Sequence, residues 1–160
     1  MRAGADLVDL AAATRQQIIA VRERHPDVGV CTADVAAARA AGAIAVCPGI
    51  VAARASGLEA ARLLVEVPLA LVPQACREGW AAVVDADEAV AQARGRGGQG
   101  DASGISDDAD SGALAIAAIA SWLGAAAVRT RHPGPVRRAL DMTASIRGLR
   151  PPARAVRGLA

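Results

Sequence analysis

The stretch that decides the fold is VGVCTADVAAARAAGAIAVCPG, residues 28–49. It opens with a short apolar run, residues 28–31, and continues with Thr32 in the N-cap position of an alanine-rich helix. Gly42 stands where helices most often end, and a second apolar run follows at residues 43–46. Two short strands joined by one helix lie parallel in a sheet with a right-handed crossover, so this stretch predicts a βαβ unit.

The same alternation continues on both sides of this unit. Short runs rich in β-branched residues recur between alanine-rich stretches of helical character. This alternation is typical of α/β proteins with a parallel sheet. We expect strands at residues 7–10, 28–31, 43–46, 63–67, 80–86 and 125–130. We expect helices at residues 11–24, 33–42, 51–62 (with a weak interruption at Ser56 and Gly57), 73–78, 87–94, 113–123 and 135–147.

Two segments depart from this pattern. Residues 94–112 are rich in Gly, Ser and Asp and have almost no large apolar side chains, so burial cannot offset the entropy of ordering them. Their glycines lack the spacing of a phosphate-binding loop. We therefore expect a single domain at residues 1–148 that contains a flexible loop at 94–112. A basic, proline-broken tail follows at residues 149–160.

The composition excludes several kinds of function. All 18 basic residues are arginine, so the chain has no lysine for a Schiff base or a P-loop. A net charge of +2 and only two aromatic residues argue against a nucleic-acid partner. The longest apolar run, residues 113–123, is too short to cross a bilayer and is interrupted by Ser121. We expect a cytoplasmic protein without membrane contact, and the three widely spaced cysteines are expected to be reduced thiols.

Several motifs, in this order, resemble the dihydropteroate synthase family, the pterin-binding barrels of folate biosynthesis. GADLVDL at residues 4–10 resembles G-A-D-I-I-D-V, and residues 28–49 resemble S-I-D-T, its helix and N-D-V-S-G. ARLLVEVPLAL at residues 61–71 resembles A-R-L-V-L-D-P-G-L-G-F. Residues 79–89 stand where G-I-P-V-L-V-G-A-S-R-K belongs. Residues 108–146 give the best match, because G-A-x-x-V-R-V-H-D-V aligns there without a gap.

The resemblance implies a TIM-type (β/α) barrel, but family members have more strands and are much longer. The first family strand, with its N-V-T-P-D-S-F loop, would lie before Met1. The family strand that carries M-H-x-R has no counterpart between Gly49 and Leu63. The implied fold is an α/β fold of reduced or incomplete TIM-type (β/α) barrel, with about six parallel strands and flanking helices.

The resemblance also indicates what the site has lost. Cys31 replaces the pterin-facing Asp of S-I-D-T, and Cys47 replaces the Asn of N-D-V. Thiols are weak hydrogen-bonding groups and cannot orient a pterin ring well. No lysine stands at the S-R-K position. We therefore assign no catalytic residue and no metal ligand.

Other family positions are kept in part. Glu66 stands for the Asp of D-P-G-L-G-F, and Arg129 keeps the Arg of R-V-H. Arg131 takes the His position, and His132 is its neighbour. The residues that we expect to bind a ligand are Glu66, Arg129, Arg131 and His132.

These residues also have simpler explanations. The cations are either a remnant anion site at the end of a barrel strand or surface charges beside Pro133 and Pro135. Glu66 either faces the barrel mouth or pairs with an arginine such as Arg62. The two cysteines fit small core residues better than nucleophiles.

The acidic residues near strand ends also have structural explanations. We expect Asp9 to cap the helix that follows it. Asp85, Asp87 and Glu88 fit a divalent-cation site and the charged start of a helix equally well.

The sequence thus predicts a dihydropteroate synthase-like protein that is catalytically impaired and acts as a non-catalytic homologue or an oligomeric partner. The alternative is an active transferase or a binder of a pterin or another phosphorylated anionic ligand. We expect no cofactor, with Mg²⁺ only if the chain is active. The family dimerises through its last helices, and a six-stranded sheet leaves two open edges. We therefore expect a homodimer or a hetero-oligomer with a full-length homologue.

Overall fold

The computed structural model describes residues 5–96 and 105–151 of the chain. The strands are β1 (Leu7–Asp9), β2 (Gly29–Thr32), β3 (Ile44–Pro48), β4 (Leu63–Glu66), β5 (Ala82–Asp85) and β6 (Ala127–Arg129). The helices are α1 (Arg15–Arg24), α2 (Val35–Ala41), α3 (Gly49–Ala55), α4 (Val72–Arg77), α5 (Ala86–Arg96), α6 (Ile105–Leu123) and α7 (Pro133–Ile146). Short 3-10 turns lie at Ala60–Arg62 and Leu69–Leu71. The alternation that the sequence predicts is therefore present.

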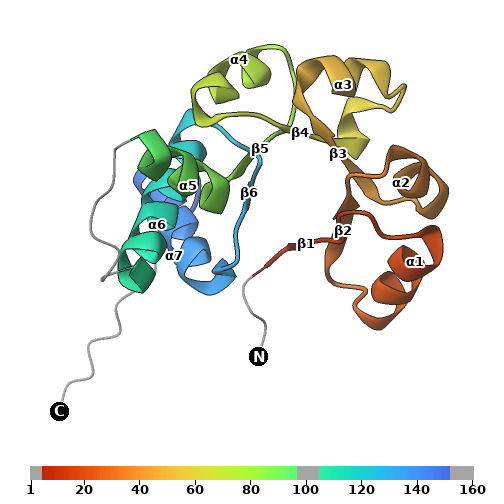
Figure 1. Cartoon of the computed structure of the whole chain (residues 1–160), viewed down its shortest axis with the longest axis horizontal. Coiled ribbons are helices and arrows are strands. Elements are labelled where there is room, and N and C mark those ends of the chain that lie inside the picture. The colour runs from red at the N-terminus through yellow and green to blue at the C-terminus, as the bar shows by residue number, and fades with distance from the viewer. Residues whose placement is uncertain (1–4, 97–104, 152–160) are drawn as a thin grey trace.

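The strands form one curled, parallel sheet. Each strand pairs with the next one along the chain, in the order β1-β2-β3-β4-β5-β6. The helices flank the outer side of the curl (Figure 1). β3 pairs directly with β4, with Ala45 opposite Leu63, so that no strand lies between them. This architecture confirms the predicted incomplete TIM-type α/β fold of six parallel strands.

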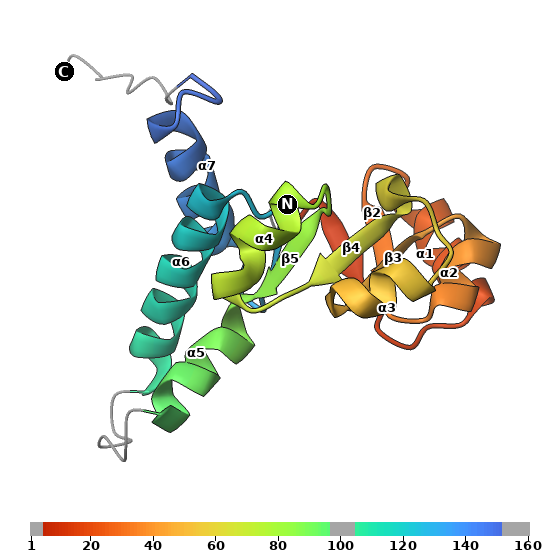
Figure 2. The ribbon, with the colours of Figure 1, turned by 90° about the horizontal axis from the view of Figure 1, so that it is seen from above.

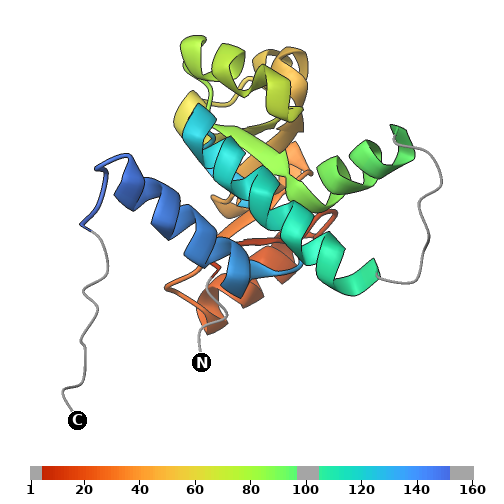
Figure 3. The ribbon, with the colours of Figure 1, turned by 90° about the vertical axis from the view of Figure 1, so that its left-hand side faces the viewer.

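The helices fall into two groups along the molecule. Figure 2 shows α1, α2 and α3 at one end and α5, α6 and α7 at the other, with α4 between them. Seen from the side in Figure 3, α6 crosses α7, and α5 leads away from the sheet. α6 packs against both α5 and α7, and α5 and α6 also contact β6, so the C-terminal third forms its own helical layer.

The two sides of the sheet are packed differently, because alternate residues of a strand point to opposite sides. The outer side packs against the helices and forms the main core, which includes Val30, Ala45, Cys47, Leu63, Val65, Ala82 and Val84. The inner side carries a smaller cluster of Cys31, Val46, Leu64 and Val83. The core thus lies mainly between the sheet and its helices, and the inner side of the curl is less filled.

Several helix ends follow the signals in the sequence. Gly42 ends α2 with a φ of 67°, a left-handed conformation that favours glycine, as its position predicts. α1 begins later than expected, because Thr14 and Gln17 form a capping box there. The helix expected at residues 51–62 ends at Ala55, and Gly57 has a φ of 64° in the following turn. We expected only a weak interruption at Ser56 and Gly57, but α3 ends there.

The loop expected at residues 94–112 is helical at both of its ends. α5 continues to Arg96 and α6 begins at Ile105, and residues 97–104 lie outside the described residues. The two helices approach closely, since a Cβ on Gly112 would lie 2.9 Å from Cγ2 of Val90. Packing between α5 and α6 thus orders residues whose composition alone favours a loop. The tail of residues 152–160 also lies outside the described part.

A helix that crosses a bilayer must be both long and apolar. Among the helices of residues 5–96 and 105–151, none combines the length and the apolar character that a bilayer crossing requires.

Candidate functional site

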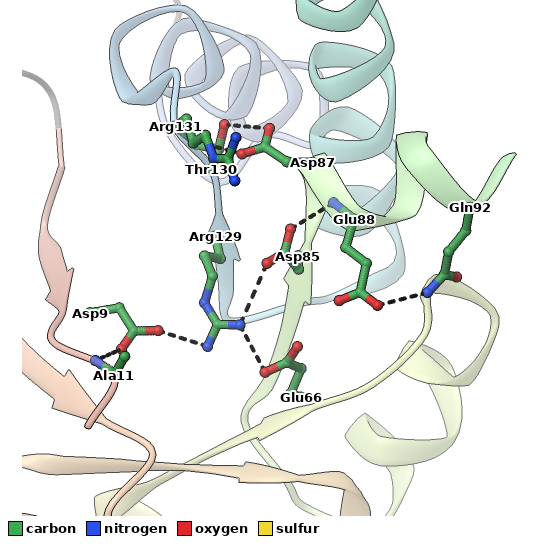
Figure 4. Close-up of polar contacts among 10 residues, drawn as sticks. All are labelled: Asp9, Ala11, Glu66, Asp85, Asp87, Glu88, Gln92, Arg129, Thr130 and Arg131. Carbon is green, nitrogen blue, oxygen red and sulfur yellow. Dashed lines mark hydrogen bonds and ion pairs between the residues drawn. The ribbon is translucent and has the colours of Figure 1, made fainter. Parts of the chain in front are cut away.

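Four charged side chains meet at one end of the sheet. Arg129 is the last residue of β6, and Asp9, Glu66 and Asp85 are the last residues of β1, β4 and β5. The carboxyl ends of parallel strands lie at the same edge of a sheet, so residues far apart in sequence come together there. Figure 4 shows the three carboxylates directed at the Arg129 guanidinium from different sides.

Arg129 is the centre of this cluster, which we call the strand-end cluster. Its Nη2 lies 2.8 Å from Oδ2 of Asp9, and its Nη1 lies 2.9 Å from Oε2 of Glu66 and 3.5 Å from Oδ2 of Asp85. Burial lowers the pKa of Arg129, but the hydrogen bond to Glu66 and the charges of the three carboxylates outweigh it and raise the pKa. Three carboxylates and one guanidinium leave two net negative charges.

Neighbouring backbone groups fix two of these carboxylates. Oδ1 of Asp9 accepts a hydrogen bond of 2.8 Å from the N–H of Ala11, and Oδ1 of Asp85 accepts one of 2.9 Å from the N–H of Glu88. Asp85 therefore also serves the start of α5. The expectation that Asp9 caps the following helix is wrong, because Thr14 caps α1. Asp9 instead contacts the opposite edge of the sheet through Arg129.

The residues expected to bind a ligand are brought together only in part. Glu66 contacts Arg129 and not Arg62, which donates to the carbonyl oxygens of Ala38 and Ala43. Arg131 is exposed, and its N–H donates to Oδ2 of Asp87 at 2.8 Å. Figure 4 shows Arg131 beside Asp87 and apart from the guanidinium of Arg129.

His132 lies just before α7. It is half-buried, and its N–H donates to the hydroxyl of Thr130 at 3.0 Å. The same hydroxyl lies 3.4 Å from Oδ1 of Asp87, so Asp87 helps to fix the turn between β6 and α7. The four predicted residues thus divide into a contacting pair, Glu66 and Arg129, and a separate turn that holds Arg131 and His132.

The acidic residues beside β5 have the features of both interpretations that the sequence left open, the charged start of a helix and a divalent-cation site. Asp85 and Asp87 make the helix-start and turn contacts described above. Glu66, Asp85 and Glu88 also each place one carboxylate oxygen within 4.8 Å of the other two. Oxygen ligands suit Mg²⁺, but Arg129 already contacts two of these three carboxylates. A divalent cation would therefore have to compete with the guanidinium.

A cavity of about 870 Å³ adjoins the strand-end cluster. It extends along the inner side of the sheet past Cys31, Leu64 and Val83, and Arg129 and Arg131 both line it. Its volume suits a small molecule. The cavity therefore has an apolar floor and a charged rim in which acidic groups outnumber basic ones.

The two cysteines at family site positions face opposite sides of the sheet. Cys31 belongs to the inner cluster, and Cys47 packs in the main core against the helices. Burial, with the charge of Asp9, raises the pKa of the Cys31 thiol to about 11, although Arg129 lowers it. Burial also raises the pKa of Cys47. Both thiols stay protonated at neutral pH, so they fit core residues and not nucleophiles.

The sequence interpretation missed Asp9 and Asp85 as partners of Arg129. A signal for them was available in the pattern, because each ends a strand of a parallel sheet, as Glu66 and Arg129 do. Because the carboxyl ends of parallel strands share one edge of the sheet, the acidic residues that end the first, fourth and fifth strands lie at the same edge as the arginine of the sixth. Which of them touch it depends on how tightly the sheet curls.

The chain is similar to known proteins in sequence over one stretch and in fold over most of its length. No protein-family profile matches the chain. Over 49 residues, the chain is 51% identical to inactive dihydropteroate synthase 2 of Mycobacterium tuberculosis and of Mycobacterium bovis. This stretch is 31% of the chain and 15% of the length of these relatives, so the chain matches only a small part of them.

Solved structures are similar over nearly the whole chain. The dihydropteroate synthase of Coxiella burnetii in complex with pteroic acid has a TM-score of 0.63 at 12% identity, covering 92% of this chain and 82% of its own. The Yersinia pestis enzyme with a pterine-sulfa conjugate has a TM-score of 0.65 at 15% identity, covering 91% and 84%. A Mycobacterium tuberculosis structure has a TM-score of 0.62 at 19% identity, covering 94% and 85%.

These comparisons confirm the resemblance that the motifs suggest. The fold is that of dihydropteroate synthases, and one stretch of the sequence is similar to an inactive member of that group. The chain is dihydropteroate synthase-like.

Proposed function

We propose that the chain is a non-catalytic relative of dihydropteroate synthase that acts as an oligomeric partner in the cytoplasm. The observation that carries this proposal is that Arg129 is already paired with carboxylates of the chain itself. The family reaction needs cations that stabilise a departing pyrophosphate. Here the guanidinium that the resemblance assigns to that task is already engaged by Asp9, Glu66 and Asp85, at 2.8 to 3.5 Å. An incoming anion would meet a net negative cluster.

Two further features support the loss of turnover. Cys31 and Cys47 stand where the resemblance expects a carboxylate and an amide, and their thiols are buried. The chain also has no lysine to contribute to anion binding. Each lost polar contact to a transition state costs on the order of a hundredfold in rate, and here several are lost together.

The activity assay tests this proposal directly. The purified chain, incubated with pterin pyrophosphate and p-aminobenzoate with and without Mg²⁺, is expected to form product no faster than the heat-denatured chain. The Yersinia pestis dihydropteroate synthase serves as the positive control for the substrates. An enzymatic rate that disappears in Arg129→Met would refute the proposal.

One observation favours the alternative, a binder of a pterin or another phosphorylated anion. Arg131 lines the same cavity as Arg129, and its guanidinium has no carboxylate within ion-pair distance among the contacts of the described residues. In this case Glu66, Arg129, Arg131 and His132 would contribute to the ligand site. Calorimetric titration with inorganic pyrophosphate separates the two proposals: binding that weakens in Arg131→Met supports the alternative.

The proposed partner surface is formed by α6 and α7. Large apolar side chains are exposed on both helices: Ile119 and Trp122 on α6, and Met142 and Ile146 on α7, between 47% and 67% exposed. Because α6 and α7 pack on each other, these side chains form a surface that a second copy or a full-length homologue could cover.

This surface gives a prediction for the oligomeric state. We expect the chain to elute as a dimer, and Trp122→Glu with Met142→Glu to shift it to a monomer, because two charges would be buried in an apolar contact. Size-exclusion chromatography with light scattering measures this shift. Val51→Glu, at an apolar side chain that is 82% exposed on α3, is the matched control and should leave the dimer intact. A monomeric unmodified chain at micromolar concentration would contradict the prediction.

A further inference from the structure

The curled sheet is open between its first and last strands. β1 and β6 are the two edges, and within the described residues no strand pairing joins them. Side chains connect them instead: Arg129 of β6 contacts Asp9 of β1, and Arg137 of α7 contacts Asp6 just before β1. Both contacts are between side chains, so among the described residues the backbone groups of the two edge strands are not paired with each other across the opening. We call this opening the edge slot.

The backbone on each side of the edge slot has hydrogen-bonding groups that face into it. In β1, the carbonyl of Asp6 accepts from Gly29 and the N–H of Leu10 donates to Cys31, so alternate residues of β1 turn toward β2. The residues between them, such as Leu7, therefore turn their N–H and C=O toward the slot.

The same alternation holds on the other side of the slot. The N–H of Ala126 donates to the carbonyl of Ala82 in β5 at 2.8 Å. The next residue, Ala127, therefore turns its N–H and C=O away from β5 and toward the slot. Two parallel edges thus present matching rows of donors and acceptors to the same opening.

The cavity of about 870 Å³ on the inner side of the sheet extends to this opening. Val8 of β1 and Ala127 of β6 line its two sides, Leu64 and Val83 line its floor, and Leu140 of α7 lines its wall. Val8 is 37% exposed, although β-branched residues in strands are normally covered by neighbours. Unpaired backbone groups on two strand edges beside apolar side chains fit an extended polypeptide, because a polypeptide backbone supplies donors and acceptors at every second residue.

The charge of the edge slot differs between its two ends. At the carboxyl ends of the strands, Asp9, Glu66 and Asp85 surround Arg129, and these four groups leave two net negative charges, whereas at the other end Asp6 is paired with Arg137. A strand that entered parallel to β1 and β6 would bring its own C-terminal end to this acidic end. A basic side chain at that position would complement the charge.

We propose that the edge slot binds an extended segment of a partner polypeptide, as one added strand parallel to β1 and β6. Its apolar side chains face Leu64 and Val83 at alternate positions, and a basic side chain at its C-terminal end lies among Asp9, Glu66 and Asp85. The added strand pairs the two open edges. This function goes beyond the lack of turnover and does not depend on it.

The probe is an acetylated hexapeptide, Thr-Val-Thr-Val-Thr-Arg amide, in which both valines and the arginine share one face. We expect it to bind at least about tenfold more tightly than the peptide Arg-Thr-Val-Thr-Val-Thr, whose arginine would lie at the wrong end. A version with N-methylated threonine and valine amides should bind at least about tenfold more weakly, because it lacks the donors. Fluorescence anisotropy of labelled peptides measures these ratios.

Hydrogen exchange followed by NMR locates the bound peptide. We expect protection of the Leu7 and Ala127 amides to rise on peptide addition. The amides of Val8 and Val128, which turn toward β2 and β5, should not change. Ala127→Pro removes one donor that faces the slot from an edge strand, where proline is tolerated, and should weaken binding. The N-methylated peptide gives the same test if this variant does not fold.

Three results would overturn the proposal. One is equal binding of the three peptides, and another is binding that leaves the Leu7 and Ala127 amides unprotected. The third is protection of these amides in the chain alone that grows with its concentration, because the occupant would then be a second copy. The assay for dihydropteroate formation is independent of all three, so failure of this proposal is distinguishable from failure of the proposed function.

Discussion

Replacing Arg129 by methionine is expected to lower the free energy of unfolding by about 2–3 kcal/mol. The substitution keeps most of the apolar stem but leaves Asp9, Glu66 and Asp85 facing one another without a cation. The side chains of the cluster are 21% to 31% exposed, so water screens part of their repulsion and the loss stays below that of a fully buried pair. Urea denaturation followed by circular dichroism measures the difference.

Two variants control this experiment. Glu66→Gln with Asp85→Asn in the Arg129→Met background should recover roughly half of the loss, because it removes two of the three repelling charges. Arg54→Met removes an ion pair to Glu78 at 2.8 Å in which Arg54 is 64% exposed, and it should cost less than about 1 kcal/mol. Equal losses for Arg129→Met and Arg54→Met would mean that the strand-end cluster does not hold the edges of the sheet.

Neighbouring leucines of β4 are expected to differ widely when each is shortened to alanine. Leu63 is 2% exposed on the outer side, within the main core under the helices. Leu63→Ala should lower the free energy of unfolding by about 3 kcal/mol, because it leaves a void in a well-packed region. Leu64 is 7% exposed, but it lines the inner cavity. Leu64→Ala should cost about 1–1.5 kcal/mol, since it only enlarges a space that already exists.

The pair is its own control, because both leucines lie in the same strand and lose the same atoms. The two free energies of unfolding are measured in urea, together with the m-value, which reports any change in the surface exposed on unfolding. A loss at Leu64 as large as that at Leu63 would mean that the inner side of the sheet is packed as tightly as the outer side.

The order of strands and helices could be predicted from local sequence because each element carries its own signal. Apolar runs of strand length predicted the six strands, and Gly42 predicted the end of α2. The ends of α5 and α6 could not be predicted in this way. Residues 94–96 and 105–112 have the composition of a loop, and they are helical because α5 and α6 pack against each other near Gly112.

The candidate site was predicted only in part, for a similar reason. The motifs identified Glu66 and Arg129, and the structure brings them into contact at 2.9 Å. Arg131 and His132 follow Arg129 closely in sequence but lie in the turn held by Asp87. We placed Arg131 and His132 in one site with Arg129 because they are close in sequence, but the turn separates them from it.

The sequence by itself determined that the protein is a parallel α/β fold with six strands, because the alternation of short apolar runs and helices is a local property. It also determined that Arg129 stands at a strand end. Only the tertiary structure decided what Arg129 contacts, because the curl of the sheet brings the end of β1 across to β6. Three carboxylates from distant parts of the chain therefore contact the cation at the end of β6.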